Sequence, residues 1–296
     1  MTLHYTDAFN VCVRRRWGRF SSDVQRTANN NGRMRRGQLS LHESEPDALS
    51  DVISFQKMHM TTFQRLLASC NDQGLISVDD LMRTQNIAVV DFGAGAATVG
   101  IAINAQWANY LSSFDYFPIE PHPAMQSIGT CLLKNLSTPR TPAFCLTCNL
   151  RIPQQLINEP YPQNCPHCEV VLPQEVGWQW PVHGYMKNLR QLENTNFEAL
   201  ITADRLFFTF SYLFQQNALL PVDVQNIVEL ISSLKTRCSA DKTIEILATG
   251  ARTKQLYNHM DQFLLKFDEL RIMYDMKELS LTNDSSWKRY VRIDCD

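Results

Sequence analysis

The sequence predicts an α/β protein with a doubly wound, mostly parallel sheet, an antiparallel C-terminal hairpin, a helical N-terminal cap and a small metal-binding insertion. Short apolar runs alternate with segments of helical periodicity, which is typical of parallel strands joined by helices. A glycine-containing turn follows the first of these runs, and a short polar turn joins the last two. The 296 residues, 44% of them hydrophobic, are sufficient for a core of this size.

The first segment, residues 1–45, is predicted to be a basic, flexible arm. Residues 1–40 hold eight arginines against two aspartates, a net charge of +6, which leaves −8 for the rest of the chain. A polar segment of this kind buries too little apolar surface to fold alone. It is suited to contact phosphates. Organelle transit peptides are also arginine-rich, and a solvated tail without a partner is equally compatible with this composition.

A helical cap is expected over residues 46–84. Apolar residues recur there at intervals of three and four, as on the buried face of a helix. They are Leu49, Val52, Ile53, Phe55, Met58, Phe63, Leu66 and Leu67. A polar turn around Asn71 and Asp72 follows this run and precedes the sheet.

The sheet domain is predicted in two parts that flank an insertion at residues 139–181. In the first part, 85–138, we expect strands at 87–91 and 116–120 and helices at 97–111 and 124–136. In the second part, 182–296, we expect strands at 197–203 and 243–248, helices at 222–235 and 253–267, and a hairpin formed by 270–281 and 287–293. Strands that alternate with helices imply a parallel sheet covered on both faces.

The segment from Val89 to Thr98 combines a strand, a glycine-containing turn and the start of a helix. Gly93 permits a tight turn, and Gly95 lets the backbone approach a ligand closely. The helix N-terminus that follows favours negatively charged groups. The strand before the turn and the helix after it therefore predict a nucleotide-binding site.

Together with the acidic Glu120 after the second strand and the C-terminal hairpin, the Asp-x-Gly-x-Gly-x-Ala pattern resembles class I S-adenosylmethionine-dependent methyltransferases. The resemblance covers about residues 85–294, apart from the insertion. It implies that Glu120 accepts hydrogen bonds from the ribose hydroxyls of the cofactor, and that Asp91, Gly93 and Gly95 face its methionine part. A dinucleotide enzyme would also bind ribose through an acid at this place, but the hairpin argues against that alternative.

The insertion contains two Cys-x-x-Cys pairs separated by sixteen residues. The pairs are Cys145 and Cys148, followed by Cys165 and Cys168. Each pair places two thiolates on one tight turn, and the spacing is typical of a tetrahedral zinc ribbon. An iron–sulfur cluster is the alternative. Zinc held by four cysteines has no open coordination position, so we expect a structural role.

The other five of the nine cysteines are scattered, and each is interpreted as a small buried residue. They are Cys12, Cys70, Cys131, Cys238 and Cys295. The odd number and the absence of a recognisable secretory signal favour an intracellular, reducing compartment, which is the cytoplasm, the nucleus or an organelle matrix. No apolar run approaches the length of roughly 18 residues that spans a membrane, so no membrane partner is expected.

Residues on the acceptor side of the site are expected at the end of the strand predicted at 197–203. Asp204 is our candidate for a catalytic base. The segment lacks the Asn/Asp-Pro-Pro-aromatic motif of exocyclic-amine methyltransferases, so those substrates are disfavoured. One of the aromatic residues that follow is a candidate for base stacking, although most are expected in the core. They are Phe207, Phe208, Phe210, Tyr212 and Phe214.

The predicted function is a methyltransferase that uses S-adenosylmethionine and acts on RNA, with the basic arm and the metal knuckle binding the polymer. Two alternatives remain open. One is a catalytically inactive, methyltransferase-like protein that binds RNA or the ribosome. The other is a methyltransferase for proteins or small molecules, in which the knuckle docks a protein partner.

Overall fold

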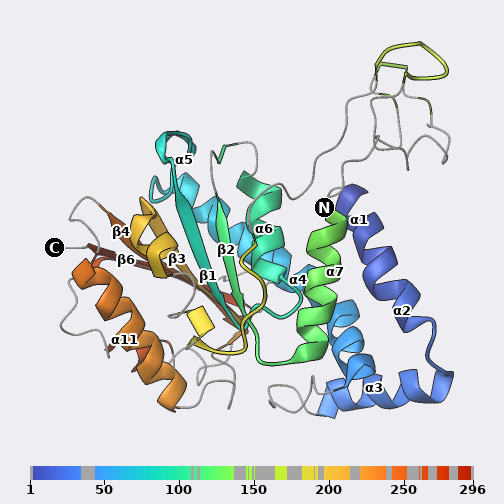
Figure 1. Ribbon diagram of the computed structural model, residues 1–296, viewed down its shortest axis with the longest axis horizontal. Helices are drawn as coiled ribbons and strands as arrows, with labels where there is room; N and C mark the ends of the chain where they lie inside the picture. Colours follow the sequence, from blue (N-terminus) through green and yellow to red (C-terminus); the bar gives the residue numbers. More distant parts are fainter. Residues whose placement is uncertain are drawn as a thin grey trace.

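The computed structural model contains one six-stranded sheet with the strand order β2-β1-β3-β4-β6-β5 (Figure 1). It describes residues 3–34, 44–107, 110–111, 114–136, 145, 147–148, 150, 164–171, 182–189, 191–192, 197–213, 221–237, 242–251, 260, 262–265, 272–279 and 286–294. The strands are β1 Ile87–Phe92, β2 Asp115–Ile119, β3 Arg205–Ser211, β4 Thr243–Ala251, β5 Ile272–Leu279 and β6 Ser286–Asp294. The first four are parallel, and the β5–β6 hairpin adds β6 antiparallel to β4. The predicted fold class is therefore confirmed.

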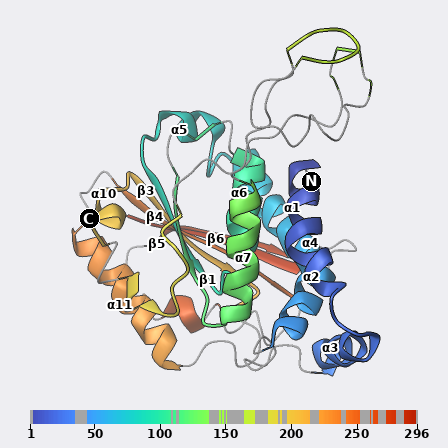
Figure 2. The ribbon, with the colours of Figure 1, turned by 45° about the vertical axis from the view of Figure 1, so that its right-hand side comes forward.

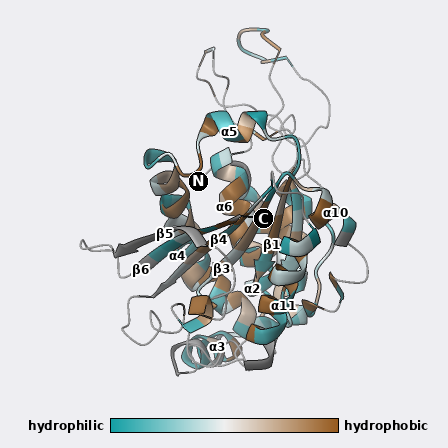
Figure 3. Cartoon of the chain, turned by 90° about the vertical axis from the view of Figure 1, so that its left-hand side faces the viewer, coloured by the Kyte–Doolittle hydropathy of each residue, from teal (hydrophilic) through white to brown (hydrophobic). Residues whose placement is uncertain are grey.

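Helices cover both faces of this sheet (Figure 2). They are α1 Leu3–Phe9, η1 Asn10–Arg14, α2 Arg15–Trp17, α3 Ser22–Met34, α4 Glu45–Asp72, α5 Val78–Arg83, α6 Thr98–Trp107, α7 Pro123–Leu136, α10 Phe197–Thr202 and α11 Pro221–Arg237. Side chains alternate between the faces along each strand. Phe207 packs in the core cluster with α4, α6 and α7, while Phe208 packs with α10 and α11. Hydrophilic and hydrophobic residues both appear on the helices around the sheet (Figure 3), as expected for amphipathic helices.

Helix α4 runs antiparallel to the neighbouring parallel strands. Gln56, in its first half, reaches the turn after β1, whereas Leu75, just beyond its end, contacts Arg205 at the start of β3. Helix α3 contacts the first turns of α4 through the Asn29–Ser50 hydrogen bond. The beginning of α4 and helix α3 therefore lie toward the carboxyl ends of the strands (Figure 1).

The prediction of a flexible arm is wrong for residues 3–34, which form helices docked on the body of the protein. Tyr5, Ala8 and Cys12 are buried in the same core cluster as α4, α6 and α7. Their spacing of three and four residues places them on one helical face. Arginines dominate the composition of this segment, so the short apolar stripe was not recognised from the sequence. The helical cap begins near residue 3 instead of residue 46.

The strand predicted at 197–203 is also wrong, because residues 197–202 form helix α10. The strand begins at Arg205, and its residues from Arg205 to Phe210 are buried. A continuous apolar run favours a strand that is covered on both faces, and Leu206–Phe210 fits that description better than the preceding segment. Most of the helix predicted at 253–267 lies outside the described residues.

Two cysteines that the sequence treats as separate buried residues are paired. Cys12 of η1 and Cys131 of α7 form a disulfide that joins positions 119 residues apart in sequence, with a Cα–Cα distance of 5.7 Å. Cys70 is buried, as predicted, and takes no part in a disulfide. Cys238 and Cys295 lie outside the described residues. The disulfide therefore fastens the N-terminal helices to α7.

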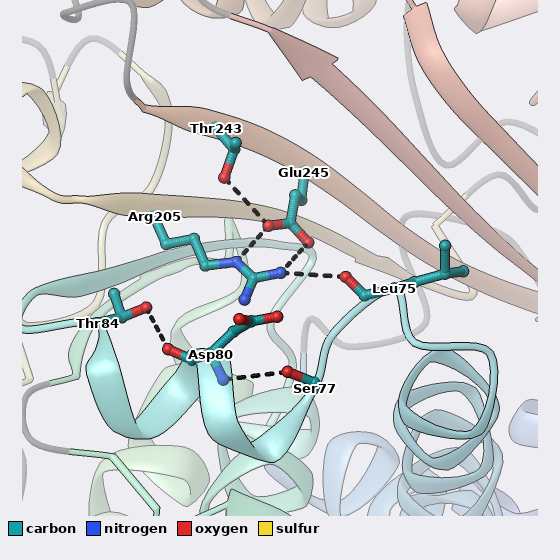
Figure 4. A network of polar contacts seen from close by, with 7 residues as sticks. All are labelled: Leu75, Ser77, Asp80, Thr84, Arg205, Thr243 and Glu245. Atoms are coloured by element: carbon teal, nitrogen blue, oxygen red, sulfur yellow. Dashed lines mark hydrogen bonds and ion pairs between the residues drawn. The ribbon is translucent and has the colours of Figure 1, made fainter.

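A buried ion pair joins β3, β4 and the segment before β1 at the amino-terminal edge of the sheet (Figure 4). The Arg205 guanidinium donates to both carboxylate oxygens of Glu245, with Nη2 3.0 Å from Oε2, and Nη2 also lies 3.4 Å from the Leu75 carbonyl. The Asp80 carboxylate points toward Arg205 from α5. A paired, hydrogen-bonded arrangement is what the burial of charge requires.

None of the helices in the described part of the chain combines the length and the apolar character needed to span a membrane.

Candidate cofactor and metal sites

The turn between β1 and α6 has a backbone that only a few residue types adopt easily. Gly93, Gly95 and Ala97 have φ angles of +65°, +54° and +60°. The first two are accessible to glycine without strain, whereas the third is unusual for alanine. A Cβ on Gly93 would lie 2.7 Å from Leu213 Cδ1. The positive φ angle therefore favours glycine at Gly93, and the Leu213 side chain after β3 packs close to it.

The structure brings together two of the predicted cofactor residues, Gly95 and Glu120. The Glu120 side chain is 4% exposed, and its Oε2 accepts a hydrogen bond from the Gly95 N–H at 2.9 Å. Its Oε1 accepts from the His122 N–H at 3.0 Å. Glu120 thus fixes the glycine turn and the start of the loop after β2 from one buried position.

Asp91, the third predicted residue, lies beneath the turn. It is 0% exposed, and its carboxylate accepts hydrogen bonds from Tyr116 Oη at 2.6 Å and Thr209 Oγ1 at 2.8 Å. Burial raises the pKa of Asp91 to about 7, against the opposing effect of these hydrogen bonds, and the neighbouring Glu120 raises it further. Asp91 therefore ties β1 to β2 and β3 as a buried carboxyl that titrates near neutral pH.

A further segment, residues 182–186, lies along the outer edge of β2 and supports the turn from another side. The Glu120 N–H donates to the Met186 carbonyl at 2.8 Å, and the Met186 N–H donates to the Pro118 carbonyl at 3.0 Å. Tyr185 Oη donates to the Gly95 carbonyl at 3.0 Å. Tyr185 therefore lies beside the glycine turn, where it helps to hold the Gly95 peptide.

His183 lies farther back on the same edge, beside the start of β2. Its Nε2 is 2.6 Å from Asp115 Oδ1, and its ring stacks on Phe117 at a centroid distance of 4.0 Å. These contacts are structural and place His183 away from the glycine turn. Trp178 and Trp180, which precede this segment, lie outside the described residues.

The N-terminal helices also contribute to the turn, a role that the sequence analysis missed. Gln56 of α4 is buried, and its Nε2 donates to the Ala96 carbonyl at 2.9 Å. Tyr5 Oη of α1 donates to Gln56 Oε1 at 3.1 Å. Gln56 is a polar residue on the apolar stripe of α4, and a buried amide needs hydrogen-bond partners. This is the feature of the sequence that could have indicated its role. The turn is thus held by residues from α1, α4, the 182–186 segment and the loop after β2.

At the carboxyl end of β3, Tyr212 has a φ angle of +60°, which is rare for an aromatic residue. Its N–H donates to the Thr249 carbonyl at 2.8 Å, and its hydroxyl lies 3.4 Å from Thr62 Oγ1 of α4. Its ring stacks on His59 at 3.7 Å between centroids. Leu213 follows and packs against Gly93. The segment after β3 therefore adjoins the cofactor turn.

Asp204, the predicted base, lies at the opposite edge of the sheet. Its carboxylate accepts hydrogen bonds from the backbone N–H groups of Gln85 at 3.2 Å and Asn86 at 2.9 Å, just before β1. It precedes β3 instead of ending it, because the strand starts at Arg205. Asp204 was predicted at the site only because its strand was placed too early in the chain, and it lies away from the glycine turn.

The four cysteines of the insertion meet at one point, with their Sγ atoms all within 4.8 Å of one another. The Cys145–Cys168 and Cys148–Cys165 sulfur pairs are 3.5 and 3.7 Å apart. Tetrahedral zinc with Zn–S bonds of about 2.3 Å requires sulfur separations of about 3.8 Å. The donor set and its spacing thus fit a single ion.

Two turns of the same kind form this cluster. The Cys145 N–H donates to the Leu150 carbonyl at 3.0 Å, and the Cys165 N–H donates to the Val170 carbonyl at 2.8 Å. The His167 N–H points to Cys165 Sγ at 3.5 Å, but the exposed His167 side chain does not belong to the ligand group. His167 therefore lies next to the cluster without being one of its ligands.

No protein-family model matches the chain, and no curated protein sequence matches it. Structures with a similar fold include precorrin-6y C5,15-methyltransferase from Geobacter metallireducens, with 12% identity over 73% of this chain and 83% of that chain and a TM-score of 0.34. A SAM-dependent methyltransferase from Leishmania major has 9% identity over 92% and 82%, with a TM-score of 0.38. Magnesium protoporphyrin IX methyltransferase from Synechocystis with bound SAM has 10% identity over 93% and 98%, with a TM-score of 0.35.

Similarities this low do not indicate an activity, so the assignment rests on this chain's own topology. The glycine turn follows β1, Glu120 follows the adjacent strand β2, and the hairpin adds antiparallel β6 next to β4. These are the features that the sequence predicted together. The chain therefore has the fold of a class I S-adenosylmethionine-dependent methyltransferase, with an additional four-cysteine cluster.

Proposed function

We propose that this protein binds S-adenosylmethionine at the turn after β1 and transfers its methyl group to RNA. The observation that carries the proposal is the hydrogen bond between Glu120 and the Gly95 N–H, which joins the two parts of the predicted cofactor site. Glu120 would accept the ribose hydroxyls, and the Gly93–Gly95 turn would border the methionine part. The bound cofactor supplies an electrophilic methyl group on a positively charged sulfonium.

The charge of the turn suits this cofactor. Asp91 and Glu120 are buried carboxyl groups on adjacent strand ends, and both lie within reach of the turn. Glu120 contacts the turn directly, and a carboxylate there attracts a cationic ligand. Asp91, whose pKa burial raises to about 7, is partly protonated near neutral pH and adds less to this attraction. Methyl transfer from a sulfonium depends mainly on the alignment of donor and acceptor, so the absence of a recognised base among the described residues is compatible with the proposal.

RNA is favoured as the acceptor by the basic face of η1, α2 and α3. Arg14, Arg15, Arg19 and Arg26 are exposed there, whereas Arg16 forms an ion pair with Glu45. The Arg26 side chain contacts Asp23, and that pair is exposed and therefore weak. Because these helices are docked near the carboxyl ends of the strands (Figure 1), phosphates bound to them would bring a polymer toward the turn.

For the four-cysteine cluster we propose a structural zinc ion. Cysteine sulfurs within 4.8 Å of one another surround one ion closely. A four-iron cluster would place several iron and sulfide atoms between the ligands and would hold them farther apart.

The test of the function uses S-adenosylmethionine carrying an isotopically labelled methyl group. The protein is incubated with it and with total RNA, total protein or a small-molecule extract. We expect label in RNA and calorimetric binding of the cofactor. Label in protein or in small molecules instead of RNA would identify that class of molecule as the methyl acceptor. RNA binding without any transfer would support the inactive RNA-binding alternative, and an absence of cofactor binding would overturn the proposal.

A further inference from the structure

Three aromatic rings form a continuous stack beside the end of β3. Phe55 and His59 lie four residues apart on α4, with ring centroids 6.1 Å apart and planes inclined by 16°. His59 and Tyr212 continue the stack at 3.7 Å and 21°. All three side chains are only partly buried. Part of this aromatic surface is therefore accessible to a ligand.

The position of Tyr212 is determined by its backbone as well as by stacking. The φ angle of +60° turns the chain at the end of β3, and the bond from its N–H to the Thr249 carbonyl fixes that turn against β4. The hydroxyl lies 3.4 Å from Thr62 on α4. A large ring is thus held in a conformation that glycine would adopt more easily, which is a feature found often at ligand sites.

Sequence neighbours of the stacked residues contact the proposed cofactor turn from α4 and from the segment after β3. Leu213, next to Tyr212, packs against Gly93 of the turn. Gln56, next to Phe55, donates to the Ala96 carbonyl of the same turn. The backbone that carries the stack is therefore held next to the turn, where an acceptor must be placed for methyl transfer.

The stack is electrically neutral near pH 7. Burial lowers the pKa of His59 to about 4, although Asp51 opposes this shift, so the imidazole carries no proton charge at neutral pH. Neutral rings have no strong attraction for phosphate but bind other planar rings through their faces. The chemistry of the surface therefore points to a nucleobase and away from the sugar–phosphate backbone.

We propose that Phe55, His59 and Tyr212 form a stacking platform that holds one base of the RNA acceptor next to the methyl donor. This inference rests on the proposed function and adds that the base is the part of the RNA substrate that the protein recognises. The exposed arginines of η1, α2 and α3 would contact phosphates, and the platform would add a contribution that depends on the base.

The experiment compares two fluorescent oligoribonucleotides of eight residues, one with bases throughout and one abasic at its central positions. Both carry the same phosphate charge, so electrostatic attraction is matched. For the wild-type chain we expect the oligonucleotide with bases to bind about tenfold more tightly. Tyr212→Leu should abolish most of this preference while leaving the affinity for the abasic oligonucleotide unchanged. Tyr212→Phe, which keeps the ring, should retain the preference.

Tyr110→Leu is the matched control, since Tyr110 is an exposed tyrosine after α6 and lies outside the stack. It should leave both affinities unchanged. Equal binding of the two oligonucleotides by the wild-type chain, or an equal loss of both in Tyr212→Leu, would overturn the platform. Calorimetry with S-adenosylmethionine on the same samples separates the two proposals, because cofactor binding without base preference contradicts the platform alone.

Discussion

Glu120 has two tasks that a substitution affects differently. In the protein alone, it accepts the N–H groups of Gly95 and His122, and in the proposed complex it also accepts ribose hydroxyls. Glu120→Gln keeps one acceptor oxygen and turns the other position into a donor, which faces a backbone N–H. Hydrogen bonds to charged groups are each worth about 1.5–3 kcal/mol. We therefore expect this variant to bind S-adenosylmethionine at least tenfold more weakly in calorimetry while remaining folded.

Glu198→Gln provides the control for that measurement, since it removes one exposed carboxylate on α10. Its cofactor affinity should equal that of the wild-type chain. An unchanged affinity in Glu120→Gln would show that Glu120 stabilises the turn but does not contact the cofactor.

Asp91 predicts a pH dependence of stability. Its pKa is raised from 3.8 to about 7, mainly by burial, so the folded protein retains this proton over a range in which the unfolded chain has lost it. The contribution is fully present below about pH 4 and is lost as the pH rises through 7. The loss is at most about 1.4 kcal/mol per pH unit. The free energy of unfolding is measured by denaturant titration at pH 5, 6, 7 and 8. Asp91→Asn should lack this part of the pH dependence, and the same pH dependence in the variant and the wild-type chain would contradict the raised pKa of Asp91.

Among the helices and strands, the sequence predicts most accurately those strands whose ends are marked by turn residues. β1 stops at a glycine turn, and the C-terminal strands are joined by a polar turn, so their limits agree closely with the prediction. The helices of residues 3–34 were missed because their buried stripe is narrow and is embedded among arginines. Burial of such a stripe depends on α4 and α7, which lie far away in sequence and which local composition does not reveal.

The same limitation explains which of the predicted site residues the structure brings together. Asp91, Gly93, Gly95 and Glu120 belong to strand ends, where parallel topology gathers residues at one edge. Asp204 was misplaced because its strand was assigned too early along the chain. Gln56 contributes through a helix that precedes the sheet, and contacts between distant elements of this kind require the structure.

The four-cysteine element predicts close to one zinc per chain in elemental analysis. Zinc contributes about 10–16 kcal/mol to folding in isolated zinc-finger peptides, so the knuckle should depend on its ion. Cys148→Ser should lose the metal, while Cys70→Ser should retain it, because Cys70 is a buried cysteine outside the four-cysteine cluster. Iron with acid-labile sulfide in the purified protein would exclude zinc and keep the same ligands.

The disulfide between η1 and α7 predicts a redox dependence of stability. Removal of a native disulfide commonly lowers stability by about 2–5 kcal/mol, and this one closes a long loop. Cys131→Ser should therefore unfold at lower denaturant concentration than the wild-type chain without reductant. Reductant should lower the wild-type midpoint to the same value and leave the variant unaffected. Two additional reactive thiols in unreduced protein would show instead that Cys12 and Cys131 are not bonded.

At the scale of the whole molecule, the N-terminal helices join the basic surface to the cofactor site. Tyr5 reaches Gln56, Gln56 reaches Ala96, and Cys12 is bonded to α7. These contacts make residues 3–34 part of the core. Deletion of this segment would expose buried surface and could not test phosphate binding separately from folding, so charge must be changed at exposed positions instead.

The corresponding prediction concerns the salt dependence of RNA binding by an Arg14→Gln, Arg15→Gln, Arg19→Gln triple variant. The three side chains are exposed, so their replacement leaves the core intact. Each phosphate contact releases counterions and contributes about −0.7 to the slope of log affinity against log salt on a single strand. If all three contact phosphates, the slope should become shallower by about 2, with weaker binding at low salt. Arg83→Gln on α5, at the opposite edge of the sheet, should change neither quantity. A triple variant that keeps the wild-type slope would place the phosphate contacts elsewhere and would separate the basic surface from RNA recognition.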